Sequence, residues 1–140
     1  MNTENINIAI NVMKRHRDAQ HTLHMEEYQL DACIDNVVRV EDELCGTPCC
    51  FAGYLGVSPE FIAKGGRVSD CGIPMSDDLV GEECIADFLG ITRGRAASLT
   101  WLSLEEMAYP HAVDEGVEPT FDEVIEALES LRDKGVLPGE

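Results

Sequence analysis

Helix-start and helix-stop signals follow one another closely along this chain, and their spacing constrains the fold more than any other feature. Thr47–Pro48 and Ser58–Pro59 are typical helix starts, because proline has a fixed φ and needs no N–H partner in a first turn. Glycines placed to end helices follow at short intervals: Gly56, Gly65, Gly66, Gly90 and Gly135. The chain from residue 47 onward is therefore expected to form short helices.

The last of these helices has the clearest pattern. Thr120 and Glu123 have the spacing of a capping box, and Gly135 is placed to end the helix. Between these limits the apolar residues recur at helical spacing and should line one buried face: Phe121, Val124, Ile125, Leu128 and Leu131. This amphipathic helix should be the centre of the packing.

A first helix is expected near the N-terminus, with Thr3 as its cap and Glu4 in its opening turn. Its apolar face is made of Ile6, Ala9, Ile10 and Met13. The basic cluster 14–17 follows, and it is interpreted as a last turn whose cations suit the helix dipole rather than as a binding patch. Residues 21–40 fit either a helix, which we prefer, or a short strand around Leu23 and Met25.

Further short helices are predicted over residues 82–89, ended by Gly90, and over 92–102, capped by Thr92. Ser103 and Glu106 have the spacing of another capping box. Between Gly66 and residue 82, the segment RVSDCGIPMSDDLVG is rich in glycine, proline, serine and aspartate. It predicts a long loop, and long loops in compact domains are often functional.

The predicted fold class is therefore all-α, or mainly α with minor β. The chain of 140 residues, with 44% hydrophobic and 26% charged residues, has the size and composition of one globular domain spanning 1–140. No apolar run approaches the roughly 20 residues that cross a bilayer, and the N-terminus lacks the apolar stretch of a signal peptide. We expect a cytoplasmic protein with reduced cysteines rather than a disulfide scaffold.

The formal net charge of -17 is the most unusual property of the composition. Two segments, 26–60 and 101–140, carry nearly all of the acidic excess. Such a field repels nucleic acid and anionic membranes and attracts basic proteins. The acidic residues proposed to bind a partner are Glu41, Asp42, Glu43, Asp114, Glu115, Glu118, Asp122 and Glu126.

The cysteine-rich segment 45–56 raises two alternatives to simple core packing. A zinc site could draw on Cys45, Cys49, Cys50 and Cys71, although their spacing does not match a two-residue zinc knuckle. A reactive thiol at the helix start, with His21 or His24 as base, would make a cysteine enzyme. Buried cysteine acting as a small apolar residue is the preferred interpretation, without a cofactor and without catalysis.

The same segment, CGTPCCFAG, resembles the pattern C-G-T-x-x-C-x-A-G of a family of small phage and bacterial proteins. The later IADFLGITRGRAASLTWL resembles the family's second block. Cys49 is additional, and Tyr54 stands where tryptophan or histidine is expected. The positions that carry the resemblance are Cys45, Gly46, Thr47, Cys50, Ala52 and Gly53, then Ala86, Leu89, Gly90 and Leu99. The resemblance implies a phage or mobile-element origin and an accessory role in the host cytoplasm.

The second block also has the layout of a helix-turn-helix, with Ala86, Gly90, Ala96 and Leu99 at its packing and turn positions. Its recognition helix would present Thr92, Arg93, Arg95 and Ser98 to DNA. The acidic flanks oppose this interpretation, because a DNA reader must neutralise several phosphates. The sequence therefore predicts a non-enzymatic interaction protein that binds a basic host protein, with mimicry of nucleic acid as one way of doing so. A DNA-binding regulator and a zinc- or thiol-dependent module are the alternatives.

Overall fold

The computed structural model describes residues 1–21, 23, 50–69, 72–100 and 119–138. Within these ranges the chain forms six helices and one small three-stranded sheet, which confirms the mainly α class with minor β. The proposed boundary of a single domain over 1–140 stays a prediction. Six predicted features lie at least partly outside the described residues: Thr47–Pro48, the 21–40 element, Cys45, Cys49, Cys71 and the Ser103–Glu106 capping box.

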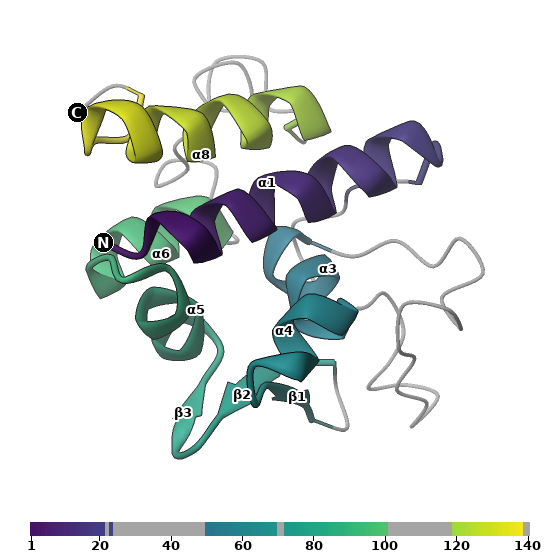
Figure 1. Ribbon diagram of the computed structural model, residues 1–140, viewed down its shortest axis with the longest axis vertical. Helices are drawn as coiled ribbons and strands as arrows, with labels where there is room; N and C mark the ends of the chain where they lie inside the picture. Colours follow the sequence, from purple (N-terminus) through teal and green to yellow (C-terminus); the bar gives the residue numbers. More distant parts are fainter. Residues whose placement is uncertain (22, 24–49, 70–71, 101–118, 139–140) are drawn as a thin grey trace.

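Helices α1 (Thr3–Asp18) and α8 (Phe121–Lys134) lie side by side and run in opposite directions (Figure 1). The predicted apolar face of α1 is buried, and Val12 joins it. The predicted apolar face of α8 is buried as well, with the Thr120–Glu123 capping box and Gly135 at its two ends. The first and last helices of the described chain therefore share one core.

The start of α1 differs from the prediction by one position. Asn2 is the cap, and its side-chain oxygen accepts a hydrogen bond from the backbone N of Asn5 at 3.0 Å. Thr3 is already in the helix. The Asn2 backbone N also donates to the Leu89 carbonyl at 2.9 Å, which ties the chain start to another helix. That second bond cannot be read from local sequence, because Leu89 is distant in the chain.

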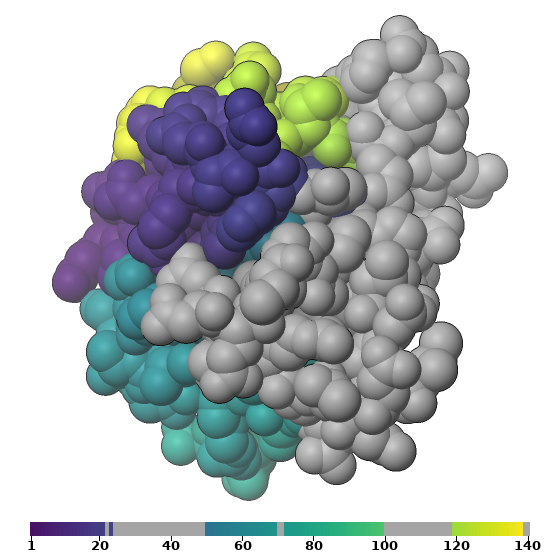
Figure 2. All heavy atoms as spheres, turned by 90° about the vertical axis from the view of Figure 1, so that its right-hand side faces the viewer, coloured from purple at the N-terminus to yellow at the C-terminus, as the bar shows by residue number. Residues whose placement is uncertain are grey.

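Helix α3 (Phe51–Val57) begins after Cys50, whose backbone is extended, so the predicted helix does not run unbroken from Thr47–Pro48; Gly56, predicted to end it, lies within α3. Cys50 is its cap, with the thiol accepting a hydrogen bond from the Gly53 backbone N at 3.3 Å. Helix α4 (Pro59–Ala63) begins as predicted, because Ser58 caps it and Pro59 occupies its first turn. Seen from the side, the C-terminal part of α1 lies between the start of α8 and the teal segment that contains α3 and α4 (Figure 2).

The predicted loop over 67–81 was wrong, because this segment forms the sheet. Strands β1 (Arg67–Val68), β2 (Pro74–Ser76) and β3 (Leu79–Val80) pair antiparallel in that order. Asp77, at a φ of 52°, forms the β2–β3 turn, a conformation that aspartate tolerates better than most residues. The strands are two or three residues long, too short for an alternating pattern to show.

Helices α5 (Glu82–Leu89) and α6 (Arg93–Thr100) follow as predicted and pack on each other below α1 (Figure 1). Gly90 ends α5 in the left-handed conformation, with a φ of 67°. A Cβ at Gly90 would lie 2.7 Å from the Asn2 backbone N, so only glycine fits beneath the chain start. The Thr92 hydroxyl accepts a hydrogen bond from the Arg95 backbone N at 3.2 Å, as the predicted cap requires.

Candidate functional site

The outward side of α8 carries a stripe of acidic residues opposite its buried face. Four carboxylates recur at intervals of three or four residues, and this spacing places them along one side of a helix. They are Asp122, Glu126, Glu129 and Asp133. Of the predicted partner-binding residues, Asp122 and Glu126 belong to this stripe, and both are exposed. The others lie outside the described residues: Glu41, Asp42, Glu43, Asp114, Glu115 and Glu118.

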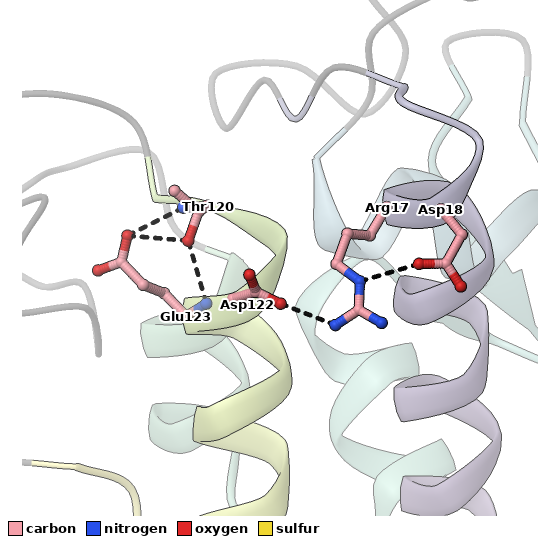
Figure 3. Close-up of polar contacts among 5 residues, drawn as sticks. All are labelled: Arg17, Asp18, Thr120, Asp122 and Glu123. Carbon is pink, nitrogen blue, oxygen red and sulfur yellow. Dashed lines mark hydrogen bonds and ion pairs between the residues drawn. The ribbon is translucent and has the colours of Figure 1, made fainter.

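Asp122 has an intramolecular role that the sequence did not suggest. Its Oδ1 accepts a hydrogen bond from Arg17 Nη1 at 2.7 Å, which joins the end of α1 to the start of α8 (Figure 3). Hydrogen bonds to Asp122 and Asp18 raise the pKa of the Arg17 guanidinium. The Thr120–Glu123 capping box lies beside this pair on the same first turn. Asp122 is thus a weaker candidate for partner binding than its exposure implies.

The C-terminal half of α8 borders a hollow of about 380 Å³. Three carboxylates line it, from Glu126, Glu129 and Asp133, together with Ser130, Lys134 and Pro138. Arg132 lies next to the hollow and donates from Nε to Asp133 at 2.9 Å, which holds the pKa of Asp133 below its usual value. Arg132 also pairs with Glu129 at 3.8 Å.

Glu126 differs from the other two carboxylates in that hollow. Within the described part of the chain, its side chain makes no ion pair and no hydrogen bond. Arg132 and Lys134 offset two of the three negative charges, so the charge that remains uncompensated is centred on Glu126. An arginine or lysine side chain entering the hollow would find its opposite charge there.

The other cations of the described chain are also largely used to hold its own elements together. Arg15 pairs with Glu60 at 3.2 Å, which links α1 to α4, and Lys64 pairs with Glu4 at 3.3 Å, which links the same two helices. Of the 10 Lys and Arg residues in the sequence, only Arg39 lies outside the described ranges. The acidic excess of the chain is therefore concentrated in 24–49 and 101–118 and is not matched by cations there.

Helices α5 and α6, with Gly90 between them, contain the residues predicted for the packing and turn positions of a helix-turn-helix. Ala96 and Leu99 are fully buried, and Ala86 is 8% exposed. The predicted DNA-contacting side is less suitable, because Arg93 pairs with Glu83 at 3.1 Å and with Glu82 at 3.8 Å. The Ser98 hydroxyl donates to the Gly94 carbonyl of its own helix at 3.1 Å. These contacts satisfy the side chains that would otherwise face phosphates.

The cysteines that the structure describes are core residues. Cys50 is 2% exposed at the start of α3, where Ala52 and Gly53 are also buried. Cys84 is fully buried, and burial, with a smaller contribution from the charge of Asp87, raises the pKa of its thiol to about 11. In the described ranges, no three His, Cys, Asp or Glu side chains lie close enough to hold a metal ion. Three of the four cysteines of the zinc alternative, Cys45, Cys49 and Cys71, lie outside the described residues, so that alternative stays a prediction.

Sequence reasoning missed a cluster of rings formed by His16, His21 and Tyr54. The two Nδ1 atoms of His16 and His21 lie 2.8 Å apart, so one imidazole donates and the other accepts a hydrogen bond. The ring centroids of His16 and Tyr54 are 4.3 Å apart, and Tyr54 in turn contacts Phe121 of α8. Burial, together with the charges of His21 and Arg15, lowers the pKa of His16 to about 4.

The predicted basic last turn is confirmed, because Arg15, His16 and Arg17 lie in the last turn of α1. Within that turn His16 is buried, whereas Lys14, Arg15 and Arg17 are at least partly exposed. The cluster connects α1, α3 and α8 at one point. A histidine among three basic residues gives no local signal of burial, since its position on the helix depends on what packs against it.

Over the described residues, none of the helices has both the length and the apolar character needed to cross a membrane. Comparisons with models of protein families, with curated proteins and with solved structures find no match. The resemblance to small phage and bacterial proteins therefore stays a prediction, and function has to be argued from the chain itself.

Proposed function

We propose that this chain is a small, acidic, non-enzymatic interaction protein that binds and modulates a basic partner protein. If the chain is encoded by a phage or mobile element, the partner is a host protein. The nucleic-acid-binding face of such a host protein is positively charged and would complement the negative charge of this chain. The hollow beside Glu126 is the observation that carries the proposal. It combines an exposed carboxylate that has no described partner with room for one basic side chain.

The carboxylates of the stripe differ in how far they are already paired within the chain. Asp122 and Asp133 are engaged by Arg17 and Arg132, so their charges partly stabilise the chain itself. Glu126 is not engaged within the described part, and adding a lysine from a partner there would create a new ion pair without breaking an existing one. Exposed pairs of this kind contribute little each, so affinity would need several of them or a network.

The charge distribution along the sequence supplies those additional sites. The acidic residues of 24–49 and 101–118 include Glu41, Asp42, Glu43, Asp114 and Glu115, and Arg39 is the only cation among them. Long-range attraction to a basic partner would raise the association rate, and this effect falls as salt screens it over about 8 Å at 0.15 M. A salt-dependent association rate is therefore the kinetic signature of the proposal.

The experiment compares two variants that change net charge equally. Glu126→Lys reverses the free carboxylate in the hollow, whereas Asp78→Lys reverses an exposed aspartate at the sheet, which Figure 1 places at the opposite end of the molecule from α8. Immobilised wild-type chain should capture a basic protein from cell extract at low salt. Capture should persist with Asp78→Lys and fall severalfold with Glu126→Lys, with the captured protein then purified for kinetic measurement.

Four outcomes test this proposal. Displacement of the captured protein by duplex DNA supports binding at a nucleic-acid-binding face. Equal loss of capture with Asp78→Lys and Glu126→Lys would show that only net charge matters and would remove the hollow from the proposal. Capture that is unchanged by salt, or tight binding of the chain itself to duplex DNA that depends on Arg93 and Arg95, would overturn it.

A further inference from the structure

A second cavity, of about 400 Å³, opens where the start of α1 meets α4, β2 and α5. Its volume falls in the range of small-ligand pockets. The residues that matter for its chemistry are Asn5, Lys64, Ser76, Cys84, Asp87 and Phe88. None of them belongs to the acidic stripe of α8, so the inference below is independent of the proposed function.

Asn5 is the unusual member of this lining. The residue is only 7% exposed, and its Nδ2 donates to the Phe88 carbonyl at 2.8 Å. Its Oδ1 is buried and accepts no hydrogen bond. Buried polar atoms without a partner are rare in native proteins, and Asn5 is one of the residues that line the cavity, so its amide oxygen is a candidate acceptor for a ligand's N–H group. The cavity therefore favours a hydrogen-bond donor near Asn5.

The charges around the cavity favour a positively charged donor. Asp87 is exposed, and its carboxylate has no ion-pair or hydrogen-bond partner in the described chain. Among the described residues of the lining the one cation is Lys64, which is paired with Glu4 at 3.3 Å and is thereby partly neutralised. The raised pKa of Cys84 keeps its thiol neutral near pH 7, so it adds no charge. The uncompensated charge of the lining is that of Asp87.

The apolar part of the lining limits the shape of a ligand. Phe88 is half-buried and packs edge-on against Phe61, with ring centroids 5.1 Å apart. A Cβ at Gly66 would be 2.2 Å from Phe61 Cε1, so the glycine allows the backbone to pack directly against that ring. Aromatic rings tolerate a nearby ammonium and pack well against an aliphatic chain.

We propose that this cavity binds a primary ammonium group carried on an aliphatic chain. The ammonium donates to Asn5 Oδ1 and faces the carboxylate of Asp87, and the aliphatic chain contacts Phe88. A free alkylamine and the side chain of a lysine share this chemistry. The binding is reversible and involves no covalent step.

The test titrates the full chain, labelled with ¹⁵N, with pentylamine and with 1-pentanol as the uncharged match. Pentylamine should give saturable shifts in the Asn5 side-chain amide signal, with a Kd on the order of millimolar for so small a ligand. N-acetyl-lysine methylamide, matched by N-acetyl-norleucine methylamide, separates the two sources. Stronger binding of the lysine compound than of pentylamine identifies a peptide side chain as the ligand, and the reverse identifies a free amine.

Charge variants test whether the cavity prefers a positively charged ligand. Asp87→Asn should weaken pentylamine binding about five- to tenfold, since one close opposite charge is lost. Lys64→Met should tighten it, because a repelling ammonium is removed. Asp78→Asn changes net charge by the same amount as Asp87→Asn outside the cavity and should leave Kd unchanged. Melting temperatures of all variants show whether the fold is retained.

Equal binding of pentylamine and 1-pentanol would overturn the proposal, because the cavity would then be only an apolar hollow. Saturable binding of acetate that is weakened by Lys64→Met and strengthened by Asp87→Asn would also overturn it, because the cavity would then prefer an anion. Absence of any saturable shift at pentylamine concentrations up to 50 times the expected Kd would overturn it directly. Asn5→Leu, tested only if it folds, should abolish the preference for amine over alcohol.

Discussion

Arg17 Nη1 donates to Asp122 Oδ1 at 2.7 Å across residues that are 105 positions apart in the chain. The pair joins the last turn of α1 to the first turn of α8, two positions after the cap of that helix (Figure 3). Both partners are on the surface, with 37% and 75% of their side chains exposed. The pair therefore aligns two helices whose association is driven mainly by apolar burial.

Reversing one charge of this pair should weaken the fold, and reversing both should restore part of the loss. Asp122→Lys places two cations together, so its melting temperature should fall below that of Asp122→Ala. Arg17→Asp combined with Asp122→Lys should recover stability relative to either single reversal. The differences should shrink in 1 M salt, and an Asp122→Lys variant as stable as the wild type would show that the contact is not populated in solution.

The cap of α1 can be located by two alanine substitutions at adjacent positions. Asn2→Ala removes a side-chain oxygen that accepts from Asn5 N, and loss of such a cap costs about 1 kcal/mol. Thr3→Ala should change the free energy of unfolding by only a few tenths of a kcal/mol, because Thr3 is within the helix. Urea denaturation measures both. The reverse order would place the cap at Thr3, where the sequence predicted it.

His16 should make stability depend on pH. Its pKa is about 4 in the folded chain and about 6.5 when exposed, so the unfolded chain binds the proton more readily. A group of this kind stabilises the fold fully above pH 6.5. Stability is then lost as pH falls from about 6.5 towards 4, and the loss from this group levels off below that range.

The full shift corresponds to about 3 kcal/mol as an upper bound. Carboxylates with lowered pKa, such as Asp133, add a loss of the same sign at lower pH, so the difference between wild type and His16→Asn is the useful quantity. The unfolding free energy of His16→Asn should be lower at pH 7 but flatter between pH 6.5 and 4. Parallel pH curves for the two proteins would show that His16 titrates normally.

Two glycines should respond to alanine in opposite directions. A Cβ at Gly56 would lie 3.0 Å from Pro74 Cβ and 3.3 Å from Val68 Cγ1, so Gly56→Ala should destabilise the chain by about 1–3 kcal/mol through overpacking. A Cβ at Gly94 would meet nothing within 4 Å, and α6 should gain about 0.5–1 kcal/mol of helix propensity. Thermal unfolding should show both signs. Destabilisation by Gly94→Ala would indicate contacts on that side of α6.

The parts of the fold that were predictable are those in which local chemistry and packing agree. The capping box of Thr120 and Glu123, the apolar face of α8 and the closing Gly135 are all encoded within one segment. Ser58–Pro59 and Gly90 likewise act through their own backbone preferences. For these elements, tertiary packing only completes what the local sequence already favours.

The parts that were missed depend on distant partners. The sheet over 67–80 has strands too short to show a period, and it exists because β2 pairs with both neighbours and packs on α3. The burial of His16 depends on Tyr54, and the engagement of Asp122 depends on Arg17. The cavity beside Asn5 is assembled from four elements. None of these relationships has a signature within a single sequence window.

The pairing of α1 with α8 has a consequence for the order of events during synthesis. A ribosome adds about 5–20 residues per second. The roughly 100 residues between α1 and α8 therefore delay the synthesis of α8 by on the order of 5–20 s. Throughout that interval the apolar residues of α1 that α8 covers lack their native neighbour. Nascent chains halted before residue 121 should therefore be held by chaperones and be sensitive to protease, and native folding should follow release of the last helix rather than proceed from the N-terminus.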